Sequence, residues 1–221
     1  SSQLVKASVV KGDLCCAKFS KDGSWYRAEV KEISDTHCSV HFLDYGNTDR
    51  VVWSDIVHCP VECTSIPIQA VRCALYEVIP CDSKWSPLAA EAMQKLTVDK
   101  PLLGRTHGQL PDGSFQVELI DTSGEKDVNI GAELALMGVA SLPGSSSKPP
   151  CSVVTPKQPL QLAPTSTKPN IKASSLPVVV IFSKDEEFSL ITVTTVDTPH
   201  CFYLQAVTQS SVETLTLLST Q

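Results

Sequence analysis

Short strand-forming segments, each separated from the next by turn residues, fill the first sixty positions of this chain. Aspartate, asparagine, serine and glycine, which favour tight turns, stand between these segments. Antiparallel strands this short and this closely spaced predict a small, strongly bent β-barrel over residues 9–60. The predicted strands are residues 14–19, 25–33, 38–45 and 49–53.

The pattern changes after residue 60, where a helix signal appears among the strands. Ser86 followed by Pro87 is typical of a helix start, with serine as the N-cap and proline in the first turn. The prediction for the whole chain is a mainly β fold with a few helices (α+β). The elements predicted in residues 61–140 are a strand within 66–75, a helix from 86, a hairpin of 102–109 with 115–120, and a helix at 130–140.

A sharp change in composition marks residues 141–177. Eight of the chain's 15 prolines lie here among serine, threonine and lysine, and the segment has no aromatic residue. Such a segment buries too little apolar surface to offset the entropy lost on ordering, which predicts a flexible linker. Strand patterns return in the last part, residues 178–221. They are predicted at residues 178–182, 188–196 and 202–207, with a helix beginning at 212–218.

Charge and hydropathy narrow the classes of partner. The net charge of −6 disfavours broad binding to phosphate backbones and favours a cationic partner. Because no apolar run approaches the roughly 18 residues that a membrane span needs, we expect a soluble protein without a membrane partner.

Nine cysteines, an odd number, are spread mostly over strand-like stretches. The simplest interpretation is reduced thiols packed as small hydrophobic side chains. A zinc site is the alternative, built from His58, Cys59 and Cys63 with His37 or Cys38 as a distant partner. Because no second spaced pair accompanies these residues, the zinc signal is poor, and we expect neither a metal nor a cofactor.

Aromatic residues recur where the predicted strands of the first barrel meet. Phe42 and Tyr45 flank an acidic residue, and Gly46 then permits the turn that sets Asn47. Pairing of the strands would bring these rings together with Tyr26 and Phe19. Four such rings are common in a barrel core. They also suit a pocket for a cation, since the faces of aromatic rings are electronegative.

Two blocks of sequence carry a resemblance to a known family. One holds Phe19, residues 22–28 and residues 42–47, and the other holds Leu75, Trp85, residues 117–124 and residues 128–130. Over residues 9–140 the chain resembles the extended Tudor domain, and within that family the multi-Tudor proteins of animal germ granules. The resemblance implies a Tudor SH3-like barrel joined to an OB-type subdomain that is similar to staphylococcal nuclease.

The resemblance also implies a binding site. The aromatic cage of the family falls on Phe19, Tyr26, Phe42 and Tyr45, with Asn47 as the polar member. Asp44 beside it would add long-range attraction or hold the strand geometry. The expected ligand is a symmetrically dimethylated arginine in an Arg-Gly-rich or Arg-Ala-rich tail of a Piwi-type protein, bound with about 6 kcal/mol. Cytoplasmic germ granules and small-RNA silencing of transposons are the implied setting.

The family also has two strands and a long helix before the Tudor barrel, which would lie before residue 1 of this chain. Residues 189–205 resemble that strand pair as the beginning of a following repeat. We therefore expect the tail to fold back and fill the two strand positions of its own subdomain, either within one chain or by exchange between molecules. The sequence leaves the oligomeric state open.

Catalysis is not expected. Glu118, Asp121 and Glu125 resemble a set of metal-binding carboxylates, yet the sequence shows no matching arginine and no basic cluster for phosphate. Two other binding classes stay open. One is an OB-type surface that contacts single-stranded RNA weakly through stacked bases, and the other is a repeat that acts only as a scaffold.

Overall fold

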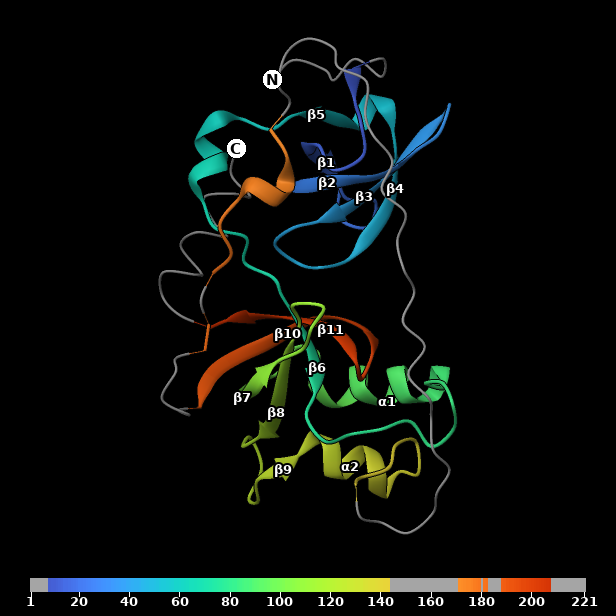
Figure 1. Ribbon diagram of the computed structural model, residues 1–221, viewed down its shortest axis with the longest axis vertical. Helices are drawn as coiled ribbons and strands as arrows, with labels where there is room; N and C mark the ends of the chain where they lie inside the picture. The colour runs from blue at the N-terminus through green and yellow to red at the C-terminus, as the bar shows by residue number, and fades with distance from the viewer. Residues whose placement is uncertain (1–7, 144–170, 180, 183–187, 208–221) are drawn as a thin grey trace.

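The computed structural model describes residues 8–143, 171–179, 181–182 and 188–207. Two β-barrels lie one above the other along the long axis of the molecule, as Figure 1 shows. The chain forms the first barrel from its N-terminal part, passes to the second, and then returns with its C-terminal strands to complete the second. The predicted mainly β fold with a few helices is confirmed.

The first barrel is a five-stranded antiparallel sheet in the order β4-β3-β2-β1-β5. Burial alternates along β3, as the period of a strand with one solvated face requires, and buried residues of all five strands meet in a single core around Cys15, Val30 and Val40. A 3₁₀ turn at Trp53–Asp55 separates the last two strands. The strands are β1 (Leu14–Lys18), β2 (Trp25–Ile33), β3 (His37–Phe42), β4 (Thr48–Val52) and β5 (Ile56–His58).

The third strand is shorter than predicted. It ends at Phe42, because the chain then turns, with the Gly46 N–H donating to the Phe42 carbonyl at 2.8 Å and the Phe42 N–H donating to the Asn47 carbonyl at 2.8 Å. Gly46 has a φ of 84°, which glycine adopts without strain. Tyr45 therefore belongs to a turn and not to the strand.

The second barrel has the strand order β6-β11-β10-β7-β8-β9, and a parallel pairing of β6 with β8 closes it. Helix α1 begins as predicted, with the Ser86 Oγ accepting a hydrogen bond from the Ala89 N–H at 3.2 Å. Helix α2 ends at Leu136, earlier than predicted. The elements are β6 (Val71–Leu75), α1 (Pro87–Thr97), β7 (Pro101–Gln109), β8 (Phe115–Asp121), β9 (Val128–Asn129), α2 (Ile130–Leu136), β10 (Ser189–Thr198) and β11 (Cys201–Ala206).

The C-terminal hairpin occupies the middle of the second barrel. Strand β11 pairs with β6, and β10 pairs with β7, so the hairpin joins two strands that would otherwise be separated. Ile191, Phe202 and Leu204 of the hairpin are fully buried in the shared core. In this structure the tail folds back within one chain and takes the two strand positions of its own subdomain. The helix predicted from residue 212 lies outside the described residues.

The prediction of a linker that extends to residue 177 was wrong at its C-terminal end. Residues 171–177 pack against the first barrel, where Ala173 and Leu176 are buried with Leu14 and Leu43. The Lys172 Nζ lies 2.7 Å from the Asp13 Oδ1. The segment lacks aromatic rings, but its aliphatic side chains and backbone hydrogen bonds are enough to hold it on the barrel. Residues 144–170 of the predicted linker are outside the described part.

All eight cysteines that the structure describes are free, and half of them are buried. Burial raises the pKa of the Cys15 and Cys73 thiols well above the ordinary value, as expected for thiols that act as small core side chains. Within the described residues, no three His, Cys, Asp or Glu side chains are grouped to hold a metal ion. No helix in this same part of the chain is long and apolar enough to cross a membrane.

Candidate functional site: an aromatic pocket between the barrels

Strand register brings three of the predicted cage residues to one side of the first barrel. Ala28 is paired with Phe42, and Tyr26 lies two residues before Ala28, so Tyr26 and Phe42 share a face. Phe19 follows the end of β1, which pairs with β2 at this position. Its N–H donates to the Ser24 carbonyl at 2.8 Å, closing the turn between the strands.

The turn after β3 supplies the other two residues. Because the Gly46 N–H bonds to the carbonyl four residues earlier, the chain makes one helical turn here, and residues three apart lie on the same side. Tyr45 therefore stands beside Phe42 and faces Tyr26. Asn47 follows at the edge of the same pocket. All five predicted cage residues line this one pocket.

The four rings meet edge to face. The ring centroids of Phe19 and Phe42 are 5.3 Å apart, those of Tyr26 and Phe42 5.9 Å, and those of Tyr26 and Tyr45 5.2 Å, with interplanar angles of 74° to 83°. Phe42 is only 1% exposed and forms the floor. Phe19, Tyr26 and Tyr45 are half-buried and form walls that open to solvent. These walls present ring faces and edges to a ligand that enters the pocket.

The rim of the pocket carries a carboxylate. The Tyr26 hydroxyl donates to the Asp22 Oδ2 at 2.7 Å, and the Ser24 N–H donates to the Asp22 Oδ1 at 2.9 Å. These hydrogen bonds lower the pKa of Asp22, so it is ionised at neutral pH. Burial, helped by the bond to Asp22, raises the pKa of Tyr26 to about 12, and burial also raises the pKa of Tyr45. The rings are therefore neutral, and the lining beside them carries both the Asp22 carboxylate and the Lys21 ammonium group.

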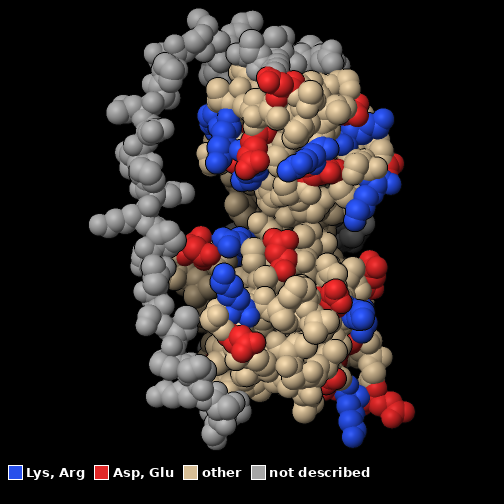
Figure 2. All heavy atoms as spheres, turned by 90° about the vertical axis from the view of Figure 1, so that its right-hand side faces the viewer, with Lys and Arg blue, Asp and Glu red and all other residues tan. Residues whose placement is uncertain are grey.

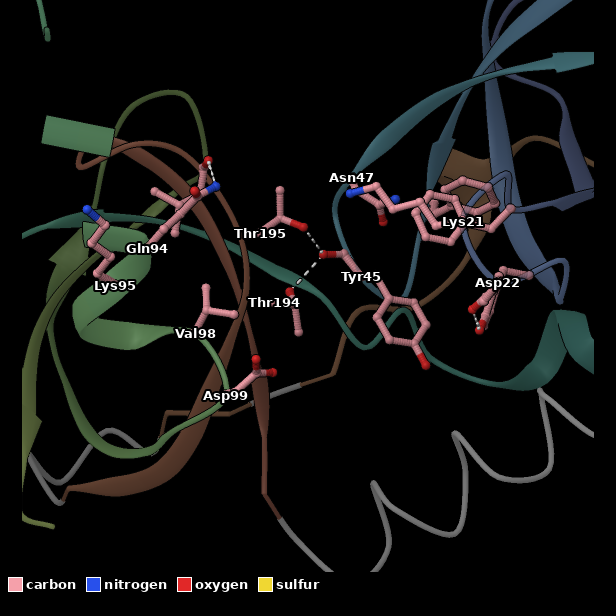
Figure 3. Close-up of a pocket in the computed structure, with 14 residues that line it drawn as sticks. Lys21, Asp22, Tyr45, Asn47, Gln94, Lys95, Val98, Asp99, Thr194 and Thr195 are labelled. Carbon is pink, nitrogen blue, oxygen red and sulfur yellow. Dashed lines mark hydrogen bonds between the residues drawn. The ribbon is translucent and has the colours of Figure 1, made fainter. Parts of the chain in front are cut away.

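The second barrel supplies the opposite wall. The cavity has a volume of about 700 Å³ and extends beyond the rings to the end of α1 and to the middle of β10, as seen in Figure 3. These residues were not predicted, because nothing in the sequence shows which part of the second barrel faces the first. They are Gln94, Lys95, Val98, Asp99, Thr194, Thr195 and Val196.

Asp44 faces away from the rings. Its side chain makes a two-pronged ion pair with Arg27, with Nη2 to Oδ1 at 2.6 Å and Nε to Oδ2 at 3.0 Å, and both residues are about 2% exposed. The Gln69 N–H also donates to Asp44. Two roles were predicted for Asp44. The geometry supports holding the turn, and with its carboxylate paired and buried it does not support long-range attraction.

The carboxylates that resemble a metal-binding set lie outside this pocket. Glu118 accepts hydrogen bonds from Arg105 at 2.7 Å and from Asn129 at 2.9 Å, partners that sequence reasoning did not identify. Asp121 is held by Ser123 and Lys100, and these hydrogen bonds lower its pKa to about 2. Glu118 and Asp121 thus each have structural partners. Glu125 lies exposed in the turn after β8.

The surface has no continuous patch of one charge on the face that Figure 2 shows. Acidic and basic side chains are interspersed there over both barrels. Proteins that bind a phosphate backbone carry clustered Lys and Arg side chains. The face in Figure 2 lacks such a cluster.

Known proteins share both the first barrel and the two-barrel arrangement. A family profile for the Tudor domain matches residues 2–77. The human TDRD1 extended Tudor domain, solved in complex with a symmetrically dimethylated peptide, has 32% sequence identity and a TM-score of 0.58, covering 64% of this chain and 69% of that one. This chain belongs to the extended Tudor domain family.

Other members of the family give the same result. Domain TD3 of mouse TDRD1, solved with a MILI peptide containing dimethylarginine, has 31% identity to this extended Tudor domain and a TM-score of 0.58. The matched region covers 62% of this chain and 70% of the mouse domain. Tudor domain-containing protein 1 from Homo sapiens is 36% identical over 132 residues, which are 58% of this chain. The chain spans 11% of the length of that protein.

Proposed function

We propose that this extended Tudor domain is a methylarginine reader without enzymatic activity. The observation that carries the proposal is the pocket itself, in which Phe19, Tyr26, Phe42 and Tyr45 surround a space that opens into the cleft between the barrels. Rings that face a pocket attract a cation by about 0.5 to 2 kcal/mol for each good contact. The rings carry no charge, and the two lysines that line the pocket are balanced by two aspartates, so the lining has no net charge that would repel a cation.

A methylated guanidinium suits this pocket better than an ammonium. The guanidinium is flat and stacks between rings, and its methyl groups lower hydration while keeping the charge, so less solvation is lost on entry. The Asn47 amide oxygen at the edge can accept a hydrogen bond from a remaining guanidinium N–H. We expect a binding free energy of about 6 kcal/mol, a dissociation constant of tens of micromolar.

The peptide around the arginine would lie in the cleft, whose far wall carries Gln94, Lys95 and Asp99. Support for a peptide ligand comes from the related TDRD1 domains solved with dimethylated peptides. We propose an Arg-Gly-rich or Arg-Ala-rich tail of a Piwi-type protein as the partner, and cytoplasmic germ granules as the location. Several repeats acting together would raise the affinity through avidity.

Titration calorimetry with one Arg-Gly peptide in three forms tests the proposal. The forms are unmodified, asymmetrically dimethylated and symmetrically dimethylated at a single arginine. We expect the symmetric form to bind most tightly, in the range of tens of micromolar. Equal affinity for all three forms, or tighter binding of a single-stranded RNA than of any peptide, would contradict a methylarginine reader.

The pocket predicts an affinity that barely changes with pH between about pH 6 and 9. The pKa of Asp22 is lowered below its ordinary 3.8, while those of Tyr26 and Tyr45 are raised, so none of these three groups changes charge in that range. Below about pH 6, affinity should fall as Asp22 gains a proton and the rim loses the negative charge of this carboxylate. The measurement uses a peptide without titratable side chains, and a change above about threefold between pH 6 and 9 would contradict this account.

A further inference from the structure

The C-terminal hairpin contacts the turn that carries Tyr45 and Asn47. The Thr194 Oγ1 lies 2.7 Å from the Tyr45 carbonyl oxygen, and the Thr195 Oγ1 lies 2.9 Å from the same atom, as the dashed lines in Figure 3 show. A single carbonyl thus accepts from two hydroxyl groups. The contact joins residues about 150 positions apart, across the two barrels.

A break in the register of β10 makes this double contact possible. In a regular strand neighbouring side chains point to opposite faces, so two consecutive threonines would not reach one atom. Here Val193 pairs with Leu204 and Thr195 with Tyr203, which leaves Thr194 as an extra residue. A bulge of this kind redirects a side chain. It turns Thr194 and Thr195 toward the same side.

The other strand of the hairpin holds the residue before Tyr45. The Gln205 Nε2 donates to the Asp44 carbonyl oxygen, and Gln205 is only 5% exposed. Two residues earlier in the same strand, the Tyr203 ring lies against Gly46, so closely that a Cβ on Gly46 would stand 2.1 Å from the Tyr203 Cγ. The hairpin can therefore pack this closely against the turn because residue 46 is glycine and has no side chain.

We infer that Thr194, Thr195 and Gln205 are positioning residues of the pocket. They hold the backbone of Asp44 and Tyr45 so that the Tyr45 ring and the Asn47 amide face the ligand. The inference rests on the proposed reader function and adds to it that pocket geometry depends on a hairpin far along the chain. When only a fraction of molecules has the competent turn, the apparent dissociation constant rises by the inverse of that fraction.

The test replaces the two threonines by valine, which keeps their shape and removes both hydroxyl groups. In the full chain, Thr194→Val with Thr195→Val should weaken binding of the symmetric dimethylarginine peptide about tenfold. The ratio of affinities between the symmetric and the unmodified peptide should also fall, because a looser turn defines the slot less well. Circular dichroism at the temperature of the titration shows that the variant is folded.

Two matched variants separate positioning from general packing. Thr194→Ser with Thr195→Ser keeps both hydroxyl groups and should bind within about twofold of the original chain. Thr192→Val makes the same exchange earlier in β10, and in the described structure Thr192 has no hydrogen bond to residues 43–47. It should leave affinity unchanged. Equal weakening by Thr192→Val and by the double valine variant would overturn the inference.

Hydrogen exchange tests the positioning role without any ligand. The Gly46 N–H donates to Phe42 within the turn, so its exchange rate reports how often the turn opens. We expect about tenfold faster exchange at Gly46 in the double valine variant and no change in the serine variant. Unchanged exchange would overturn the inference. If the original chain binds no peptide, the proposed function fails, while this exchange result still decides whether the threonines hold the turn.

Discussion

Replacing Asp44 by alanine is expected to destabilise the first barrel by about 3–5 kcal/mol. The change leaves the Arg27 guanidinium buried without a counter-charge, although its Nη atoms still donate to the carbonyls of a neighbouring segment. The Gln69 N–H also loses its acceptor. Urea unfolding measures the change in free energy, and the thermal midpoint should fall by about 10 °C.

A surface ion pair on β2, the strand that carries Arg27, provides the control. Lys31 and Glu29 lie 2.8 Å apart, but the Lys31 side chain is 39% exposed. Because solvent screens such a pair, Glu29→Ala should change the free energy of unfolding by less than about 1 kcal/mol. An Asp44→Ala variant as stable as Glu29→Ala would show that the buried pair does not hold the turn.

Replacing Tyr45 by alanine is expected to weaken binding of the methylarginine peptide by at least about thirtyfold, or about 2 kcal/mol. The variant loses a wall of the pocket but keeps the backbone contacts that hold the turn. The carbonyl at this position still accepts from Thr194 and Thr195. We therefore expect a loss of only about 1 kcal/mol in stability, that of one ring contact with Tyr26. Titration calorimetry and urea unfolding measure the two effects separately.

The matched control removes a different ring from the same barrel. Trp25 precedes Tyr26 in β2, points to the opposite face and is 37% exposed. Trp25→Ala should leave peptide affinity within about twofold, since this ring is outside the pocket. If Trp25→Ala weakened binding as much as Tyr45→Ala, the peptide would not be held by the pocket described above.

The first barrel and the meeting of its aromatic rings could be predicted from sequence for physical reasons. The place of Asn47 in the pocket came from the family resemblance, and the lining from the second barrel was not predicted. Turn residues and strand periodicity are local signals, and they set which side chains share a face. The rings of Tyr26 and Phe42 follow from that register. The end of β3 was predicted too late, because an apolar run such as Phe42-Leu43 looks the same in a strand and in a turn.

The parts that sequence reasoning missed depend on contacts between distant segments. Arg27 lies between half-buried Tyr26 and buried Ala28, and only the folded chain shows that Asp44 forms an ion pair with it. The bulge at Thr194 arises from how β10 pairs with β11, which no local pattern encodes. Likewise, Leu176 is buried because Leu14 and Leu43 lie beside it, although its own surroundings read as a linker.

The measurement that tests the pocket most directly is nuclear magnetic resonance of the complex with a symmetrically dimethylated peptide. In the proposed complex the N-methyl groups lie against aromatic rings of the first barrel. We therefore expect nuclear Overhauser contacts from the N-methyl protons to the ring protons of Phe19, Tyr26 and Tyr45, with an upfield shift of the N-methyl resonance. Contacts from those protons to any other part of the chain, with none to these three rings, would contradict it.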